Sequence, residues 1–367
     1  MKYILFLNET GESEIDIIGQ KGVFLATLFN KGFRVPPGFI ITASVFDRIK
    51  NNKLIKQLTH EYSESNNPLV LDKIQDLIKH YDFPEDVADE IIEGYLSLSV
   101  DADMDTTNLL KSTEEFVAVR SCFIGKKIDD EVRHKTMLNV RGKDKLFTAI
   151  LESYALNFVY ELKKRNNDNF SFGVIVQKMI ESQKSGVAYS VNEDNNNQIL
   201  VKAIFGLGEG IRSGNVFPDT YVVDKNSNLI ESIDIAQKQF EFVRDIDTDI
   251  TVKNRLGEKS LKQVLYDREI KEVATLVKKL ARELKEDQKV GWAIKGETIY
   301  VLQNRPLDND EDIESIEMEI IGEPELAPEV IDIEENIDDD LEMFDKIREI
   351  ESEEVETNDV NDDDEIE

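Results

Sequence analysis

The sequence predicts an α+β fold for residues 1–307 and a separate acidic tail for residues 308–367. Short apolar runs, which are typical of strands, alternate along the first part with apolar positions at helical spacing. Residues 289–306, KVGWAIKGETIYVLQNRP, are typical of a β-hairpin, because two apolar runs flank a Lys295-Gly296-Glu297 turn. Both patterns end shortly after Pro306, so we expect this hairpin to close the folded body.

Charge is distributed unevenly along the 367 residues. The net charge of −32 at pH 7 comes mainly from residues 308–367, which hold 29 of the 76 acidic residues and only two basic ones. Residues 1–307 carry the other 47 acidic and 42 basic residues, a net charge of −5. This part is long enough for two or three core-forming units. It lacks the basic surface of a nucleic-acid-binding protein, so we expect no nucleic-acid partner.

Cysteine and hydropathy patterns indicate a cytoplasmic protein. The one cysteine, Cys122, excludes an internal disulfide and a thiolate metal cluster, and it fits a reducing compartment. The first residues contain only a five-residue apolar run, which is too short for a signal peptide. No run approaches membrane-spanning length, so we expect no membrane partner.

A glycine-flanked lysine opens the first predicted helix. Residues 3–7 are predicted as a strand, and the sequence Gly19-Gln20-Lys21-Gly22 then precedes helically spaced apolar residues. Glycines let backbone amides approach a phosphate, and a helix N-terminus and a lysine both favour negative charge. The alternative is a glycine-rich turn with a solvated Lys21, because short glycine motifs are common.

The remaining elements up to residue 115 are one strand, residues 39–41, and several polar helices. His60 and His80 fall on these helices without a second ligand at metal-binding spacing, so they are interpreted as surface residues, and no metal site is predicted. Residues 116–121 then form a strand that ends on Arg120 and Ser121. The guanidinium of Arg120 is suited to phosphate oxygens, and the alternative is a surface ion pair with a carboxylate.

Most of the second half is predicted as strands. The predicted strands cover residues 136–140, 172–180, 186–190, 198–204 and 220–223, and the predicted helices cover residues 145–165 and 262–286. A glycine loop, FGLGEG, follows the fourth of these strands and contains Glu209. In the final strand Gln303 and Arg305 point to the same face, because side chains alternate with period two. We therefore expect the hairpin to present Arg305 to an anion.

The tail has runs of like charge that resist collapse, so we expect it to be mostly disordered. Ile337, Leu341 and Phe344 nevertheless fall at helical spacing. They indicate either a helix that docks on a basic protein partner or a transient solvated helix.

Four stretches together resemble a known family, the N-terminal ATP-binding domain of phosphoenolpyruvate synthase and pyruvate phosphate dikinase. They are GQKGVFLATLFNKGFRVPPGFIITASVF (19–46), VAVRS (117–121), VQKMIESQKSGVAYS through GLGEGIRSGNVFPDTYVV (176–223) and WAIKGETIYVLQNRP (292–306). The resemblance implies an ATP-grasp-like fold of two or more subdomains. We expect an N-terminal subdomain at residues 1–115, an ATP-grasp-like subdomain at 116–307 and the tail at 308–367.

The resemblance also implies ATP as the ligand and a role for each matching residue. Lys21 and Arg120 match the phosphate-contacting cations, and Gln303 and Arg305 match residues near the terminal phosphates. The strand containing Gln177 and Met179 matches the segment that borders the adenine. Glu209 matches a glutamate that faces the nucleotide.

Three departures from the family pattern make activity an open question. Lys289 and Gly291 stand where the pattern has an aspartate and a glutamate as metal ligands, which makes Mg²⁺ doubtful, and Asp287 is a candidate substitute. The loop after Arg120 is about three residues shorter than in the family and lacks the family's Ala-Gly-Gln segment. None of the three histidines lies in a phosphohistidine-domain motif, and no pyruvate-binding barrel follows.

Two functions follow from these observations. The chain is either an ATP-binding phosphotransferase that acts on a histidine of a separate protein, or a catalytically degenerate regulatory module whose acidic tail binds a partner.

Overall fold

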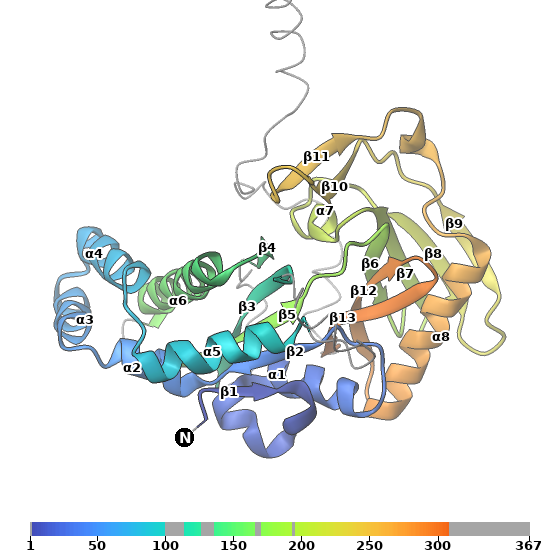
Figure 1. Cartoon of the computed structure of the whole chain (residues 1–367). Helices are drawn as coiled ribbons and strands as arrows, with labels where there is room; N and C mark the ends of the chain where they lie inside the picture. Colours follow the sequence, from blue (N-terminus) through green and yellow to red (C-terminus); the bar gives the residue numbers. More distant parts are fainter. Residues whose placement is uncertain (1, 100–113, 126–135, 166–169, 193–194, 308–367) are drawn as a thin grey trace, which may run out of the picture.

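Two antiparallel sheets and the helices that pack on them form the described part of the chain (Figure 1), a computed structural model that describes residues 2–99, 114–125, 136–165, 170–192 and 195–307. Helices and strands both contribute extensively, so the predicted α+β class is confirmed. The predicted acidic tail and its helical pattern lie outside the described residues.

The first sheet has five strands, two from residues 4–41 and three from residues 117–178. Its strand order is β1-β2-β5-β3-β4, from β1 (Ile4–Phe6), β2 (Gly38–Ile41), β5 (Ser171–Lys178), β3 (Val117–Ile124) and β4 (Met137–Val140). Because β2 pairs with β5, this sheet contains strands from both sides of the predicted boundary at residue 115. That boundary stays a prediction.

Helices cover one face of the first sheet, as the left side of Figure 1 shows. Phe46 of α2 lies at the centre of this core, with ring centroids 5.2, 5.6 and 5.0 Å from those of Tyr154, Phe158 and Phe172. Such aromatic contacts add to the stabilisation from apolar burial. The helices are α2 (Ala43–Lys50), α3 (Lys53–Ser65), α4 (Pro68–Lys79), α5 (Glu85–Ser97) and α6 (Lys143–Arg165).

Helix α1 (Ile15–Asn30) packs on the opposite face and bends at Gly19. Gly19 has φ 71° and ψ 168°, a conformation that essentially only glycine adopts. A Cβ at this position would also lie 2.4 Å from the carbonyl oxygen of Phe123 on β3. The bend therefore depends on glycine for both its backbone angles and its close packing.

The second sheet has six strands in the order β13-β12-β6-β7-β8-β9. One face packs on α8 (Asp267–Leu284) and shares a core with α1, and Trp292 is fully buried in that core. The strands are β6 (Lys184–Tyr189), β7 (Gln198–Phe205), β8 (Asp219–Asp224), β9 (Ile230–Asp234), β12 (Gln288–Lys295) and β13 (Thr298–Pro306). The predicted closing hairpin is β12–β13, with register Lys289↔Arg305 and Gly291↔Gln303.

Two details differ from the sequence predictions. Strand β3 continues to Ile124, beyond the predicted end at Ser121, so Arg120 lies within the strand and not at its exit. The strand continues because Cys122 is buried and pairs with Gly173 of β5. Strands β9 to β11 were also not predicted, since their residues are mostly polar or half-exposed and show no continuous apolar run.

A two-stranded hairpin, β10 (Phe240–Arg244) and β11 (Thr251–Arg255), joins the second sheet to the first. The guanidinium carbons of Arg244 and Arg141 lie 4.2 and 5.0 Å from the ring centroid of Phe116, which precedes β3. Asp249, in the turn of the hairpin, pairs with Arg244 at 3.0 Å and with Arg141 at 3.6 Å. The cation–π contacts and ion pairs together hold the hairpin against the first sheet.

A buried ion pair holds the segment after β9 against the second sheet. The side chains of Lys238 and Asp219 have no exposed surface, and the Lys238 ammonium donates to Asp219 Oδ1. The carboxylate also accepts from the backbone nitrogens of Ala236 at 3.1 Å and Val264 at 2.8 Å. Because every charge here has hydrogen-bond partners, the cost of burying the pair is offset.

No helix in the described ranges is both long and apolar enough to cross a membrane.

Candidate functional site: cations from two sheets

Arg120 connects the two sheets at the strand that carries Gln303 and Arg305. Its Nη1 donates to the carbonyl oxygen of Leu302 at 2.9 Å, across 182 positions in the sequence. Leu302 immediately precedes Gln303, so the Arg120 guanidinium lies beside the middle of β13. The structure thus brings together two regions that the sequence singled out separately.

Lys21 lies in the first turn of α1 after the bend at Gly19. The helix packs on β3, where the Cys122 thiol lies close to Lys21 and Gly22. Burial raises the pKa of this thiol, while the Lys21 ammonium and the backbone amides of Lys21 and Gly22 act in the opposite direction. Lys21 therefore lies beside Cys122, which follows Arg120 by two positions on β3.

Gln303 and Arg305 lie on one face of β13, as their spacing predicts. The buried Asn304 between them donates to Gln288 Oε1 at 3.0 Å. A Cβ at Gly291 would lie 2.8 Å from Gln303 Cγ, so the Gln303 side chain covers the position where the family pattern has a glutamate. Opposite Arg305, the Lys289 ammonium lies 5.4 Å from the ring centroid of Tyr189.

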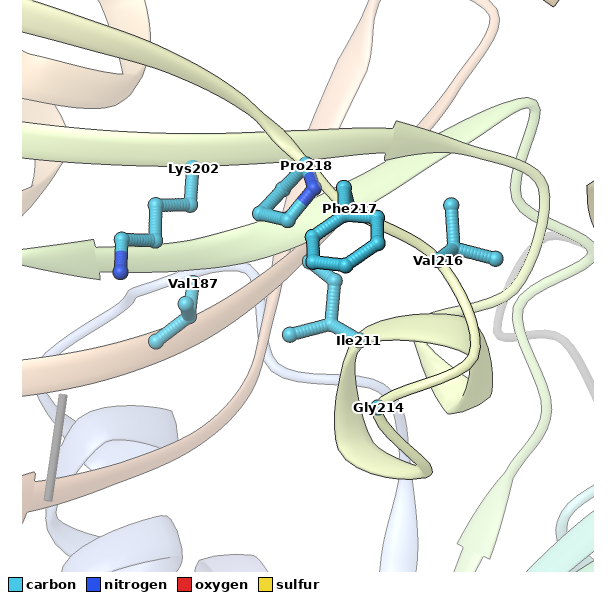
Figure 2. A pocket seen from close by; sticks show the side chains of 7 residues that line it. All are labelled: Val187, Lys202, Ile211, Gly214, Val216, Phe217 and Pro218. Carbon is cyan, nitrogen blue, oxygen red and sulfur yellow. The ribbon is translucent and has the colours of Figure 1, made fainter. Parts of the chain in front are cut away.

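A pocket opens on the second sheet beside these residues (Figure 2). Lys202 and Val187 on adjacent strands lie at one end, and the apolar side chains of Ile211, Val216 and Phe217 lie at the other. The pocket contains about 340 Å³ of free space, part of it open to solvent. An apolar wall next to one cation suits a ligand with a flat apolar part and an anionic group.

The three remaining candidates have different surroundings. Gln177 is 1% exposed, and its side-chain amide donates a hydrogen bond to the Pro36 carbonyl oxygen at 3.2 Å. The amide group therefore has a partner inside the fold. Met179 is half-buried against a small apolar cluster that contains Val216, and Ile211 packs on the same cluster; Val216 and Ile211 both line the pocket.

Glu209 begins α7 (Glu209–Arg212), the short helix that carries Ile211. Glu209 thus lies two residues before the pocket-lining Ile211, and it is not among the residues that line the pocket itself.

Sequence reasoning missed Lys202. It is 8% exposed, in a strand that is otherwise apolar and buried, QILVKAIF. A single lysine within an apolar run is a recognisable signal, because lysine is rarely buried in proteins.

The possible substitute ligand Asp287 has partners of its own. Its Oδ1 accepts from Ser190 Oγ at 2.7 Å and lies 3.6 Å from the Lys225 ammonium. Among the described residues, no group of three or more His, Cys, Asp and Glu side chains is arranged to hold a metal ion.

Cations that converge from two sheets next to an apolar pocket are typical of nucleotide-binding proteins. Residues 15–323 match the model of one such family, described as the pyruvate phosphate dikinase AMP/ATP-binding domain, and the chain belongs to this family. The family predicted from the four sequence stretches is therefore confirmed. The ATP-grasp-like arrangement that the resemblance implies stays a prediction.

Curated relatives include probable phosphoenolpyruvate synthases of two archaea. The one from Methanocaldococcus jannaschii is 30% identical over 380 residues, which cover 95% of this chain and 31% of the relative. The one from Methanothermobacter thermautotrophicus is 29% identical over 325 residues, which cover 84% of this chain and 46% of the relative. The chain thus spans less than half of the length of these relatives.

Among solved structures, D-alanine–D-alanine ligase from Bacillus anthracis aligns with 81% of this chain and 60% of its own. The TM-score is 0.32 and the identity 12%, so the assignment is based on the family match and not on this alignment.

Proposed function

We propose that the chain binds ATP on the face where Arg120 meets β13. The single observation that carries this proposal is the hydrogen bond from the Arg120 guanidinium to Leu302, which brings cations of both sheets to one place. Lys21, Arg120, Gln303 and Arg305 hold the phosphates. Planar guanidinium groups suit this task because they form paired hydrogen bonds with phosphate oxygens.

The base of the nucleotide lies towards Met179 and the apolar end of the pocket. Met179, Ile211 and Val216 pack in one cluster, which supports this orientation. In this arrangement the backbone of Gln177, and not its side chain, borders the base, since the side-chain amide bonds to Pro36. Glu209 faces the nucleotide from the adjoining helix.

A calorimetric titration of the full chain with ATP tests the proposal. We expect saturable binding, and we expect Arg305→Ala to weaken it at least tenfold because a charge-assisted phosphate contact is lost. Arg268→Ala is the matched control, since Arg268 is exposed on α8 and pairs with Glu272 of the same helix. Absence of binding with and without Mg²⁺, or an unchanged affinity in Arg305→Ala, contradicts the proposal.

Phosphoryl transfer to a histidine is a further proposal, which follows from the resemblance to phosphoenolpyruvate synthase and pyruvate phosphate dikinase. The acceptor is a separate protein that carries the phosphohistidine and pyruvate-binding domains. Incubation with such a protein and labelled ATP, followed by detection of phosphohistidine, tests the transfer. A neighbouring gene that encodes only those domains would favour it.

A non-catalytic regulatory module is the alternative function. The residues that favour it are Lys289 and Gly291, which stand where the family pattern has carboxylates. In this case nucleotide binding occurs without turnover, and the acidic residues 308–367 recruit a basic protein partner. Nucleotide binding without phosphohistidine formation in the assay above supports this alternative.

A further inference from the structure

Three cations lie on one face of the second sheet. Val290 and Trp292 are buried in the core shared with α8. Because side chains alternate along a strand, positions 289 and 291 of β12 face the other side of the sheet. Val187 and Lys202 line the pocket on that side. Gln303 covers Gly291, and Arg305 follows two positions later on β13, so Arg305, Lys289 and Lys202 share this face.

Strand register arranges these residues in two neighbouring rows across the sheet. One row runs Gln303, Gly291, Val187 and Lys202, and the next runs Arg305, Lys289 and Tyr189. Lys202 is two strands from Gly291, roughly 10 Å across the sheet. The Lys289 side chain extends over Tyr189, which lies between it and β7, and therefore towards the strand that carries Lys202.

Both lysines occupy positions that are unusual for a lysine. Lys289 lies directly opposite Arg305, so two cations form one cross-strand pair. Lys202 is 8% exposed, although lysine is rarely buried in proteins. Positively charged side chains gathered on one face in this way are suited to an anion.

The same positions do not fit a magnesium ion. Mg²⁺ requires oxygen ligands at close to octahedral geometry, usually including one or two carboxylates. Position 289 has an ammonium group, and position 291 has no side chain and is covered by Gln303. A divalent cation placed here would also be repelled by Lys289 and Arg305.

We propose that this face binds the polyphosphate of a nucleoside triphosphate that carries no divalent metal, with the ammonium groups of Lys202 and Lys289 in place of the ion. This proposal rests on the proposed nucleotide binding and specifies the form of the nucleotide. The two lysines neutralise phosphate oxygens from the floor of the site, while Arg305 and Arg120 contact them from its edge.

Titration of the full chain with ATP in excess EDTA and in excess Mg²⁺ separates this proposal from the proposed function. We expect affinity in EDTA to equal or exceed that in Mg²⁺, because metal-bound ATP carries less negative charge. Affinity that is at least tenfold higher in Mg²⁺ overturns the metal-free proposal and leaves ATP binding established. Absence of binding in both conditions overturns both proposals.

Lysine variants provide the second test. Lys202→Gln and Lys289→Gln should each lower ATP affinity in EDTA about tenfold, whereas Lys56→Gln, at an exposed position on α3, should leave it unchanged. Lys289→Asp should make binding at least tenfold stronger in Mg²⁺ than in EDTA, because it supplies a carboxylate at this position. Unchanged affinity in EDTA for both Lys202→Gln and Lys289→Gln contradicts the assignment.

Discussion

Gly19 of α1 packs directly against the carbonyl of Phe123 on β3, with no room for a Cβ between them. The contact fixes the bend of α1 and places Lys21 in the first turn after it, close to the strand that carries Arg120. The position of Lys21, which we propose as a phosphate ligand, thus depends on a glycine two residues earlier.

Gly19→Ala should destabilise the protein by about 3 kcal/mol, since it adds backbone strain and a steric overlap. Gly32→Ala is a matched control, because Gly32 also has a positive φ, 77°, but nothing within 4 Å of an added Cβ. Gly32→Ala should lower the free energy of unfolding by only about 1 kcal/mol, from backbone strain alone. Urea unfolding followed by fluorescence of the only tryptophan, Trp292, measures both. Equal midpoints for the two variants would show that the contact with Phe123 is unimportant.

Lys238→Met should cost about 3–5 kcal/mol, because it leaves the Asp219 carboxylate buried without its cation. In the double variant Lys238→Met/Asp219→Asn the uncompensated charge is gone, and the asparagine oxygen still accepts from one of the two backbone nitrogens that bond to the carboxylate, those of Ala236 and Val264. We therefore expect the double variant to recover part of the lost stability. Chemical denaturation of both variants measures this recovery, and a double variant less stable than Lys238→Met would argue against the explanation.

Asp249→Asn should loosen the β10–β11 hairpin, because it removes the charge that pairs with Arg141 and Arg244. Asparagine tolerates the positive φ of 62° at this position, so backbone strain does not obscure the result. Amide hydrogen exchange in residues 240–255 should become several-fold faster. Asp247→Asn, on the exposed part of the same turn, should leave exchange unchanged. Equal exchange rates in the two variants would contradict a role for these ion pairs.

The Cys122 thiol should react slowly in the native protein. It is fully buried, and burial raises its pKa, so less of the reactive thiolate is present near pH 8 than for an ordinary cysteine. We expect alkylation by iodoacetamide at pH 8 to be at least a hundredfold slower in the native chain than in urea. Mass spectrometry of the modified fraction over time measures this ratio. Fast alkylation of the native chain would show that α1 separates readily from β3.

Most helices and strands were predictable because their hydrophobic periodicity is a local property. The closing hairpin is the clearest case, since the shared face of Gln303 and Arg305 follows from their spacing alone. Strands β9 to β11 were missed because they are mostly polar, and their position depends on contacts such as those of Phe116 with Arg141 and Arg244. The end of β3 was misplaced because pairing with β5 extends it past Ser121.

The sequence by itself determined the family, the charge separation between residues 1–307 and 308–367, and the replacement of two expected carboxylates by Lys289 and Gly291. Only the tertiary structure decided that Arg120 reaches Leu302 and that Lys202 shares a sheet face with Lys289. These relationships join residues far apart in the chain, and strand register is set by pairing and core packing. A lysine in an apolar run is visible in the sequence, but the side chains that it faces depend on its neighbours in the sheet.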